Sequence, residues 1–103
     1  MNKVVKDGLV AVLISPGYGA GWYSWNGEES LIFNPLLVEM VEQGKASEIT
    51  EDWIKENLGF EGIYCGGVED LSIVWLPEGI KFKIEEYDGS EYLVTEDTLN
   101  LIA

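Results

Sequence analysis

The sequence predicts an α+β fold, with a mostly antiparallel sheet of about six strands and two short helices inserted after the second strand. Two Asp-Gly pairs, Asp7-Gly8 and Asp88-Gly89, lie between strand-like segments, as the turns of β-hairpins do. Two helix-like segments between these pairs each begin at a capping residue and end at a glycine. A chain of 103 residues has the length of one domain, so we take residues 1–103 as a single unit.

The first hairpin is predicted around Asp7-Gly8, where Val4-Val5 and the apolar run from Leu9 to Ile14 supply the two strands. A connection rich in glycine and aromatic residues follows this hairpin. The next apolar run, Leu31-Ile32-Phe33, fits an edge strand and also fits the lead-in to a helix.

The first helix is predicted from Pro35 to about Gln43. Asn34 can cap its free amides, proline suits the first helical position, and Gly44 ends the pattern. The second helix is predicted to begin after Thr50, its N-cap, and to end at Gly59. Two acidic residues directly after Thr50 favour the positive end of the helix dipole.

The second half of the chain is predicted to be β structure. Phe60 to Cys65 is a candidate strand, and Leu71 to Leu76 has the continuous apolar character of a central strand. The last apolar residues, Leu99 to Ile102, fit either a final helical turn or a short strand.

The second hairpin joins Ile80 to Tyr87 with Glu91 to Thr95 through Asp88-Gly89. Apolar and charged residues alternate along its first strand, as they do where one face is buried. A two-residue turn places Ile84 opposite Leu93, with both side chains on the core face. The same register pairs Lys83 with Val94 and Glu85 with Tyr92.

The charge of the chain is strongly negative, with 19 acidic residues against 6 lysines, no arginine and no histidine, for a net charge of −13. Phosphate binding needs a cationic surface, so we expect no direct binding of nucleic acid or of anionic membranes. An acidic surface is attracted instead to basic surfaces, although solubility alone also accounts for the composition. Lys81 and Lys83 can hold a phosphate, although lysine lacks the bidentate fork of arginine, and the favoured interpretation is that they offset nearby acids such as Glu85. No apolar run approaches the ~20 residues that span a bilayer, so we expect a cytoplasmic protein.

Catalysis is not expected from this composition. There is no histidine to act as a base for a serine or cysteine nucleophile, and no spacing singles out one carboxylate pair. Cys65 is the single cysteine, which excludes an intramolecular disulfide and a thiolate–imidazole metal cluster. Its neighbours Ile63 and Tyr64 indicate a small buried hydrophobic residue rather than a nucleophile. We therefore assign no catalytic residue, metal ligand or cofactor.

The segment from Ser15 to Gly27, here called the Gly/aromatic segment, is the main candidate site. Glycines let a ligand approach the main chain closely, and aromatic faces stack on flat rings or sugars. The spacing of its glycines does not match the dinucleotide-binding fingerprint. The alternative interpretation is that its tryptophans fill the core. The residues predicted to stack on a ligand are Tyr18, Trp22 and Trp25. Those predicted to offer amides, hydrogen bonds or backbone access are Ser15, Gly17, Gly19, Gly21 and Asn26.

A second candidate segment runs from Tyr64 to Asp70. Gly66-Gly67 permits unusual backbone geometry, and the carboxylates of Glu69 and Asp70 can accept hydrogen bonds from ribose hydroxyls or a base edge. They can also bind a hard cation, and a turn with solvated charges is the default for such residues. From this segment we take Tyr64, Glu69 and Asp70 as candidate ligand-binding residues.

Four runs of the sequence carry a resemblance to a known group of proteins. The first is Leu13 to Trp22 (LISPGYGAGW), followed by Trp25-Asn26. The others are Cys65 to Leu71 (CGGVEDL), Trp75 to Gly79 (WLPEG) and Ile84 to Gly89 (IEEYDG). Together they resemble small acidic proteins encoded by bacteriophages and prophages, over most of the chain. The resemblance implies a phage setting in the bacterial host cytoplasm, where small accessory proteins often counter host defences.

The function expected from the sequence is that of a non-catalytic, phage-type counter-defence protein. It would bind and sequester a small planar, nucleotide-derived ligand through the Gly/aromatic segment, and the lack of arginine counts against a ligand with several phosphates. The alternative is an acidic inhibitor that mimics nucleic acid and occupies the basic groove of a host defence enzyme. The expected partner is thus a small molecule or a basic host protein, and formation of a homodimer is left open.

Overall fold

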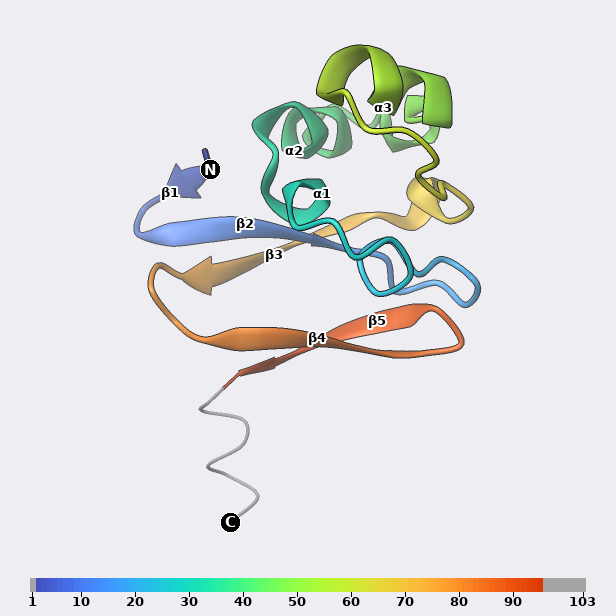
Figure 1. Cartoon of the computed structure of the whole chain (residues 1–103). Coiled ribbons are helices and arrows are strands. Elements are labelled where there is room, and N and C mark those ends of the chain that lie inside the picture. Colours follow the sequence, from blue (N-terminus) through green and yellow to red (C-terminus); the bar gives the residue numbers. More distant parts are fainter. Residues whose placement is uncertain (1, 96–103) are drawn as a thin grey trace.

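The fold, seen in a computed structural model that describes residues 2–95, is α+β with antiparallel sheets. One sheet has the strand order β1-β2-β3, and the other is a two-stranded hairpin, β4-β5. The strands are β1 (Val5–Lys6), β2 (Leu9–Ile14), β3 (Ser72–Pro77), β4 (Phe82–Tyr87) and β5 (Ser90–Thr95). The prediction of one sheet of about six strands is therefore wrong, because the described residues form five strands in two sheets. In Figure 1 the three-stranded sheet lies between the helices and the hairpin.

Within residues 2–95, three short α-helices follow β2, where two were predicted. They are α1 (Ser30–Phe33), α2 (Pro35–Glu42) and α3 (Glu51–Leu58), with 3-10 turns η1 (Ala46–Glu48) and η2 (Val68–Asp70). The run Leu31-Ile32-Phe33 belongs to α1, so the edge-strand alternative is wrong and the helical one is confirmed. None of the helices in residues 2–95 has the length and apolar character that crossing a membrane requires.

The predicted helix caps are confirmed. The Asn34 side chain accepts a hydrogen bond from the Leu36 amide at 2.8 Å, and the Thr50 hydroxyl accepts one from the Trp53 amide at 3.1 Å. Gly59 ends α3 in the left-handed region, at φ 80°. Each of these features satisfies backbone groups that a helix end leaves without a partner.

Both predicted hairpins form. The φ angles of Asp7-Gly8 and of Asp88-Gly89 are all positive, as tight hairpin turns require. Ile84 lies opposite Leu93, as predicted, and Lys83↔Val94 and Glu85↔Tyr92 complete the predicted register. The ammonium of Lys83 lies 3.0 Å from the Glu85 carboxylate, which fits the role predicted for this lysine. The predicted terminal element, Leu99 to Ile102, lies outside the described residues.

Two predictions about strands are wrong. Residues 60–65 are not a strand, because Gly62 adopts a φ of 72° and the backbone of Tyr64 bonds to the side chain of Asn26. The run predicted as a central strand forms β3, which lies at the edge of its sheet. The central strand is β2, whose residues from Val10 to Ile14 are all buried between its two neighbours and the helices.

Candidate functional site

The Gly/aromatic segment forms a series of turns between β2 and α1, and a buried carboxylate of β5 holds it in place. Glu91 is only 2% exposed. Its Oε1 accepts hydrogen bonds from the Ser15 amide at 3.0 Å and from the Ser15 hydroxyl at 3.1 Å. Its Oε2 accepts from the amides of Tyr23 and Ser24, at 2.9 and 2.7 Å. Four donors thus compensate the cost of burying this carboxylate, and they tie the segment to the hairpin.

Backbone contacts at the tip of the hairpin complete this connection. The Gly21 amide donates to the Gly89 carbonyl at 2.8 Å, and the Gly19 amide donates to the Asp88 carbonyl. A Cβ atom on Gly89 would lie 2.8 Å from the backbone nitrogen of Ala20, so a larger residue would push the two segments apart. The hairpin tip and the Gly/aromatic segment therefore form one unit.

Two of the predicted ligand-binding residues belong to the interior. Trp22 is 1% exposed, and its Nε1 donates to the Leu31 carbonyl at 2.8 Å. The Ser15 hydroxyl, also buried, accepts from the Trp22 amide at 3.0 Å while it donates to Glu91. Both residues were predicted to contact a ligand, and both are buried instead. For Trp22, the alternative interpretation of a tryptophan that fills the core is therefore correct.

Asn26 joins the two candidate segments. Its Nδ2 donates to the carbonyls of Trp22 and Tyr64, at 2.8 and 3.0 Å, and its Oδ1 accepts from the Tyr64 amide at 2.9 Å. These bonds use its side-chain amide within the protein, which corrects its expected role as a hydrogen-bonding group for a ligand. They also bring Tyr64 beside the Gly/aromatic segment.

Four exposed aromatic side chains gather where these segments meet, and we call them the aromatic face. The exposed fractions are 77% for Tyr18, 50% for Trp25, 45% for Tyr64 and 71% for Tyr87. The rings of Trp25 and Tyr64 have centroids 5.5 Å apart and an interplanar angle of 45°. Those of Tyr18 and Tyr87 lie 6.5 Å apart, edge to face. Two predicted stacking residues, Tyr18 and Trp25, are therefore accessible.

Glycine backbone connects the two ring pairs of the aromatic face. The Tyr64 hydroxyl donates to the Gly19 carbonyl at 2.7 Å. The Trp25 ring lies very close to two glycines. A Cβ atom added to Gly21 would lie 2.1 Å from this ring, and one added to Gly89 would lie 2.9 Å from it. Of the predicted glycines, Gly19 is exposed, Gly21 is buried beneath Trp25, and Gly17 is half-buried.

Four acidic residues belong to η2 or to the hairpin tip beside the aromatic face, and we call this set the acidic border: Glu69, Asp70, Glu86 and Asp88. All four residues are exposed. A Cβ atom on Gly17 would lie 2.8 Å from the Asp70 carboxylate, which places η2 beside the start of the segment. The ion pairs found in residues 2–95 join Lys6 to Glu42, Lys55 to Glu61 and Lys83 to Glu85. None of these pairs neutralises a carboxylate of the border.

Cys65 lies beside this site but is poorly suited to react. It is half-buried, and its Sγ lies 3.6 Å from the Ile63 carbonyl. Burial raises the pKa of the Cys65 thiol, and the charge of Glu51 raises it further. Since the thiolate is the reactive form, the thiol is held in its unreactive state. Residues 2–95 contain no group of three or more His, Cys, Asp or Glu side chains that could hold a metal ion.

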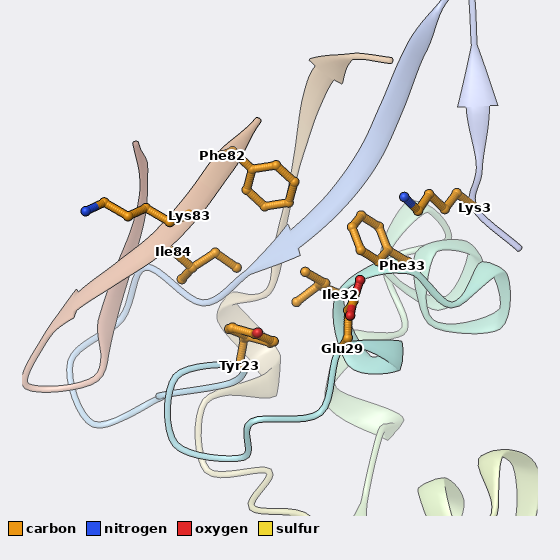
Figure 2. A pocket seen from close by; sticks show the side chains of 8 residues that line it. All are labelled: Lys3, Tyr23, Glu29, Ile32, Phe33, Phe82, Lys83 and Ile84. Atoms are coloured by element: carbon orange, nitrogen blue, oxygen red, sulfur yellow. The ribbon is translucent and has the colours of Figure 1, made fainter. Parts of the chain in front are cut away.

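An open cavity of about 430 Å³ lies between α1 and the β4–β5 hairpin (Figure 2). Tyr23 is the residue of the Gly/aromatic segment that reaches it. Its other lining residues are Lys3, Glu29, Ile32, Phe33, Phe82, Lys83 and Ile84. None of the four rings of the aromatic face lines this cavity, so the two features are separate surfaces.

Two residues of the site, Glu91 and Tyr87, were not among the residues predicted from the sequence. Side chains two positions apart on a strand share a face, so the predicted register already places Glu91 beside Leu93 on the core side. A carboxylate at a core-facing position is the signal that could have identified it. Tyr87 precedes the Asp88-Gly89 turn and was assigned only to a strand, although a large ring at a hairpin tip has little core to enter.

Comparison of the chain with protein-family models, with curated proteins and with solved structures finds no match in any of the three.

Proposed function

We propose that this protein is a non-catalytic binding protein whose aromatic face and acidic border engage a basic surface on a partner protein. The observation that carries this proposal is the presence of two pairs of exposed rings, from three separate segments of a highly charged chain, which glycine backbone connects. Contiguous exposed apolar surface marks interaction sites in soluble proteins, and tyrosine and tryptophan are enriched at protein interfaces.

The charge of the site supports a basic partner. The acidic border adds four exposed carboxylates from η2 and the hairpin tip, in a chain whose net charge is −13. Such a surface attracts lysine- and arginine-rich surfaces and accelerates their encounter, and salt weakens the attraction. A protein groove that normally binds phosphate groups has this basic chemistry.

The biological setting follows from the resemblance to small acidic phage proteins. In that setting the partner is a host defence enzyme that binds nucleic acid, and this chain acts as a counter-defence inhibitor by occupying the basic groove. The rings of the aromatic face contact apolar and stacking positions there, as bases do. The carboxylates take the place of phosphates.

A second candidate function is capture of a small planar, nucleotide-derived ligand by the same face. The specific observation in its favour is the Trp25–Tyr64 pair, whose half-exposed rings lie next to the exposed backbone of Gly19. A flat base can stack on such rings. The acidic border disfavours phosphate groups, so this candidate applies best to the nucleoside part of a ligand.

Affinity capture with paired variants tests the first proposal. The immobilised chain is exposed to a nuclease-treated bacterial lysate, and bound basic proteins are quantified as the salt concentration rises. Tyr18→Ser/Tyr87→Ser should reduce the bound amount severalfold, because it removes the two most exposed rings. Asp70→Asn/Asp88→Asn should lower the salt concentration at which the proteins elute.

The matched control is Glu56→Gln/Glu78→Gln, which makes the same charge change at exposed positions outside the site. It should bind like the parent chain. The proposal would be contradicted if the ring variant and the carboxylate variant both bound the basic proteins as strongly as this control. Thermal melting with a panel of nucleosides and nucleotides tests the second candidate: a compound that stabilises the parent chain but not Trp25→Ala would favour capture of a small ligand.

A further inference from the structure

We propose that the cavity between α1 and the β4–β5 hairpin is a binding site for a small aromatic molecule that carries one anionic group. The proposal goes beyond the function assigned to the aromatic face, and it does not depend on that function. It rests on the origin of the cavity, on its lining, and on the state of one lysine at its edge.

The cavity lies where the hairpin, which is tied to the Gly/aromatic segment at its tip, packs only partly against the core along the rest of its length. Glu91 and Gly89 bind the tip to the Gly/aromatic segment. Further along β4, Phe82 and Ile84 line the cavity on the side opposite α1 (Figure 2). The rings of Phe33 and Phe82 meet edge to face, with centroids 6.3 Å apart, and close one side of this space. The cavity is thus built into the arrangement of the two layers.

The lining suits a flat apolar body. Ile32 and Phe33 are buried core residues that reach the cavity from α1, and Phe82 and Ile84 are partly buried residues of β4 that pack against the same core. Tyr23 adds a third aromatic ring. The volume of about 430 Å³ lies within the range of roughly 300–1,000 Å³ that is usual for small-molecule sites.

The charge comes from Lys3. Its Nζ lies 4.3 Å from the centroid of the Phe33 ring, at the edge of the cavity. The ion pairs found in residues 2–95 do not include Lys3, Lys45 or Lys81, and of these three lysines Lys3 is the one that lines the cavity. An ammonium without a carboxylate partner beside an apolar cavity is placed to receive the anionic group of a ligand.

Two other charged residues limit the ligand to one anionic group. Lys83 lines the cavity, but its ammonium pairs with Glu85 at 3.0 Å and points away from the cavity in Figure 2. Glu29 also lines the cavity and brings a carboxylate toward its edge. A second negative group would therefore meet repulsion without a second free cation. The class of ligand is an aryl carboxylate or an aryl sulfonate, because each carries a single negative charge, whereas a phosphate monoester carries nearly two at neutral pH.

Two fluorescent probes test the proposal on the full chain. Anilinonaphthalene sulfonate carries an aromatic body and one anionic group, and phenylnaphthylamine has the same body without the charge. We expect one molecule of the anionic probe to bind severalfold more tightly than the neutral one. Lys3→Met should weaken the anionic probe about threefold to fivefold, as for an exposed charge pair, and leave the neutral probe unchanged. Glu29→Gln should tighten the anionic probe.

Two further variants locate the bound probe. Ile84→Phe places a larger side chain in the cavity and should weaken both probes, with circular dichroism to show that the fold is kept. Tyr18→Ser/Tyr87→Ser alters only the aromatic face and should change neither. Lys45→Met, at an exposed lysine away from the cavity, is the matched control for Lys3→Met. The proposal is overturned if the anionic probe does not bind, if Lys3→Met and Lys45→Met act alike, or if the aromatic-face variant abolishes binding.

Discussion

Replacing Glu91 by glutamine is the sharpest test of how the site is held together. Glutamine keeps the shape of the side chain and one acceptor oxygen, but it puts an NH₂ group in place of the other oxygen. In one orientation this group meets the amides of Tyr23 and Ser24, where the carboxylate now accepts at 2.9 and 2.7 Å. In the other it meets the amide and hydroxyl of Ser15. Either way, two donors lose their acceptor.

The expected loss of stability follows from these contacts. A buried donor left without an acceptor costs about 1–3 kcal/mol. The cost of leaving two such donors without an acceptor is partly offset, because the neutral amide of glutamine is easier to bury than a carboxylate. We therefore expect Glu91→Gln to lower the free energy of unfolding by about 2–4 kcal/mol, against a total of ~5–15 kcal/mol for a typical domain. The Gly/aromatic segment should loosen before the rest of the fold.

Urea denaturation followed by circular dichroism and tryptophan fluorescence measures this loss. Glu78→Gln is the control, because Glu78 is exposed in the turn between β3 and β4, and its effect should stay within about 0.5 kcal/mol. Amide hydrogen exchange should also be faster in Glu91→Gln, at Tyr23 and Ser24 in the first orientation of the glutamine and at Ser15 in the second. An unfolding free energy equal to that of the parent chain would refute the reasoning, since it would mean that these donors do not depend on the carboxylate.

Three other predictions concern the same region. Trp22→Phe should lower the free energy of unfolding by about 1–3 kcal/mol, because it leaves the Leu31 carbonyl without its donor. Trp25→Phe should change that free energy by less than about 0.5 kcal/mol, because the Trp25 ring is half-exposed. Urea denaturation compares the two variants, and equal losses would contradict the assignment of Trp22 to the core and Trp25 to the surface. Gly67→Ala should lower the free energy of unfolding by about 1–3 kcal/mol, because the new Cβ would lie 2.2 Å from the Cβ of Ala20. Thermal melting measures this loss, and an unchanged melting temperature would show that the segments around Gly67 and Ala20 are not in close contact. At mildly alkaline pH, Cys65 should react with a thiol reagent more slowly than free cysteine, because its raised pKa keeps the thiol protonated. The reaction rate of Cys65 should also keep rising at pH values where the rate of free cysteine has levelled off. A pH–rate profile like that of free cysteine would contradict this prediction.

The local features of the fold were predictable because they depend on neighbouring residues. Asp88-Gly89 adopts positive φ angles that few other pairs tolerate, and this turn alone sets which residues of the hairpin face each other. Asn34 and Thr50 cap their helices through amides two and three residues further along the chain. Such interactions are contained in a short stretch of sequence.

The number of sheets and the fate of residues 60–65 were not predictable in this way. The backbone of Tyr64 bonds to a side chain 38 residues earlier in the chain, and no pattern within 60–65 reveals that partner. The division into two sheets likewise depends on the direction in which the chain leaves β3. Apolar periodicity identifies a strand but does not identify its neighbour.

The candidate site was predictable as a region but not residue by residue. Trp22 and Trp25 lie three positions apart in the same glycine-rich context, yet one is buried and the other is half-exposed. A hydrogen bond to Leu31 holds Trp22 inside, and the small surfaces of Gly21 and Gly89 leave room for Trp25 outside. These contacts come from the three-dimensional arrangement, so composition alone could not separate the two rings.

The central claim is that the aromatic face and its acidic border form the contact surface for a basic partner. Amide hydrogen exchange of the chain, alone and with a partner protein captured as described above, tests it most directly. The account predicts that binding slows exchange in residues 17–25, 64–70 and 86–89, with little change in α2 and α3. Slower exchange in α2 and α3, with those three segments unaffected, would contradict it.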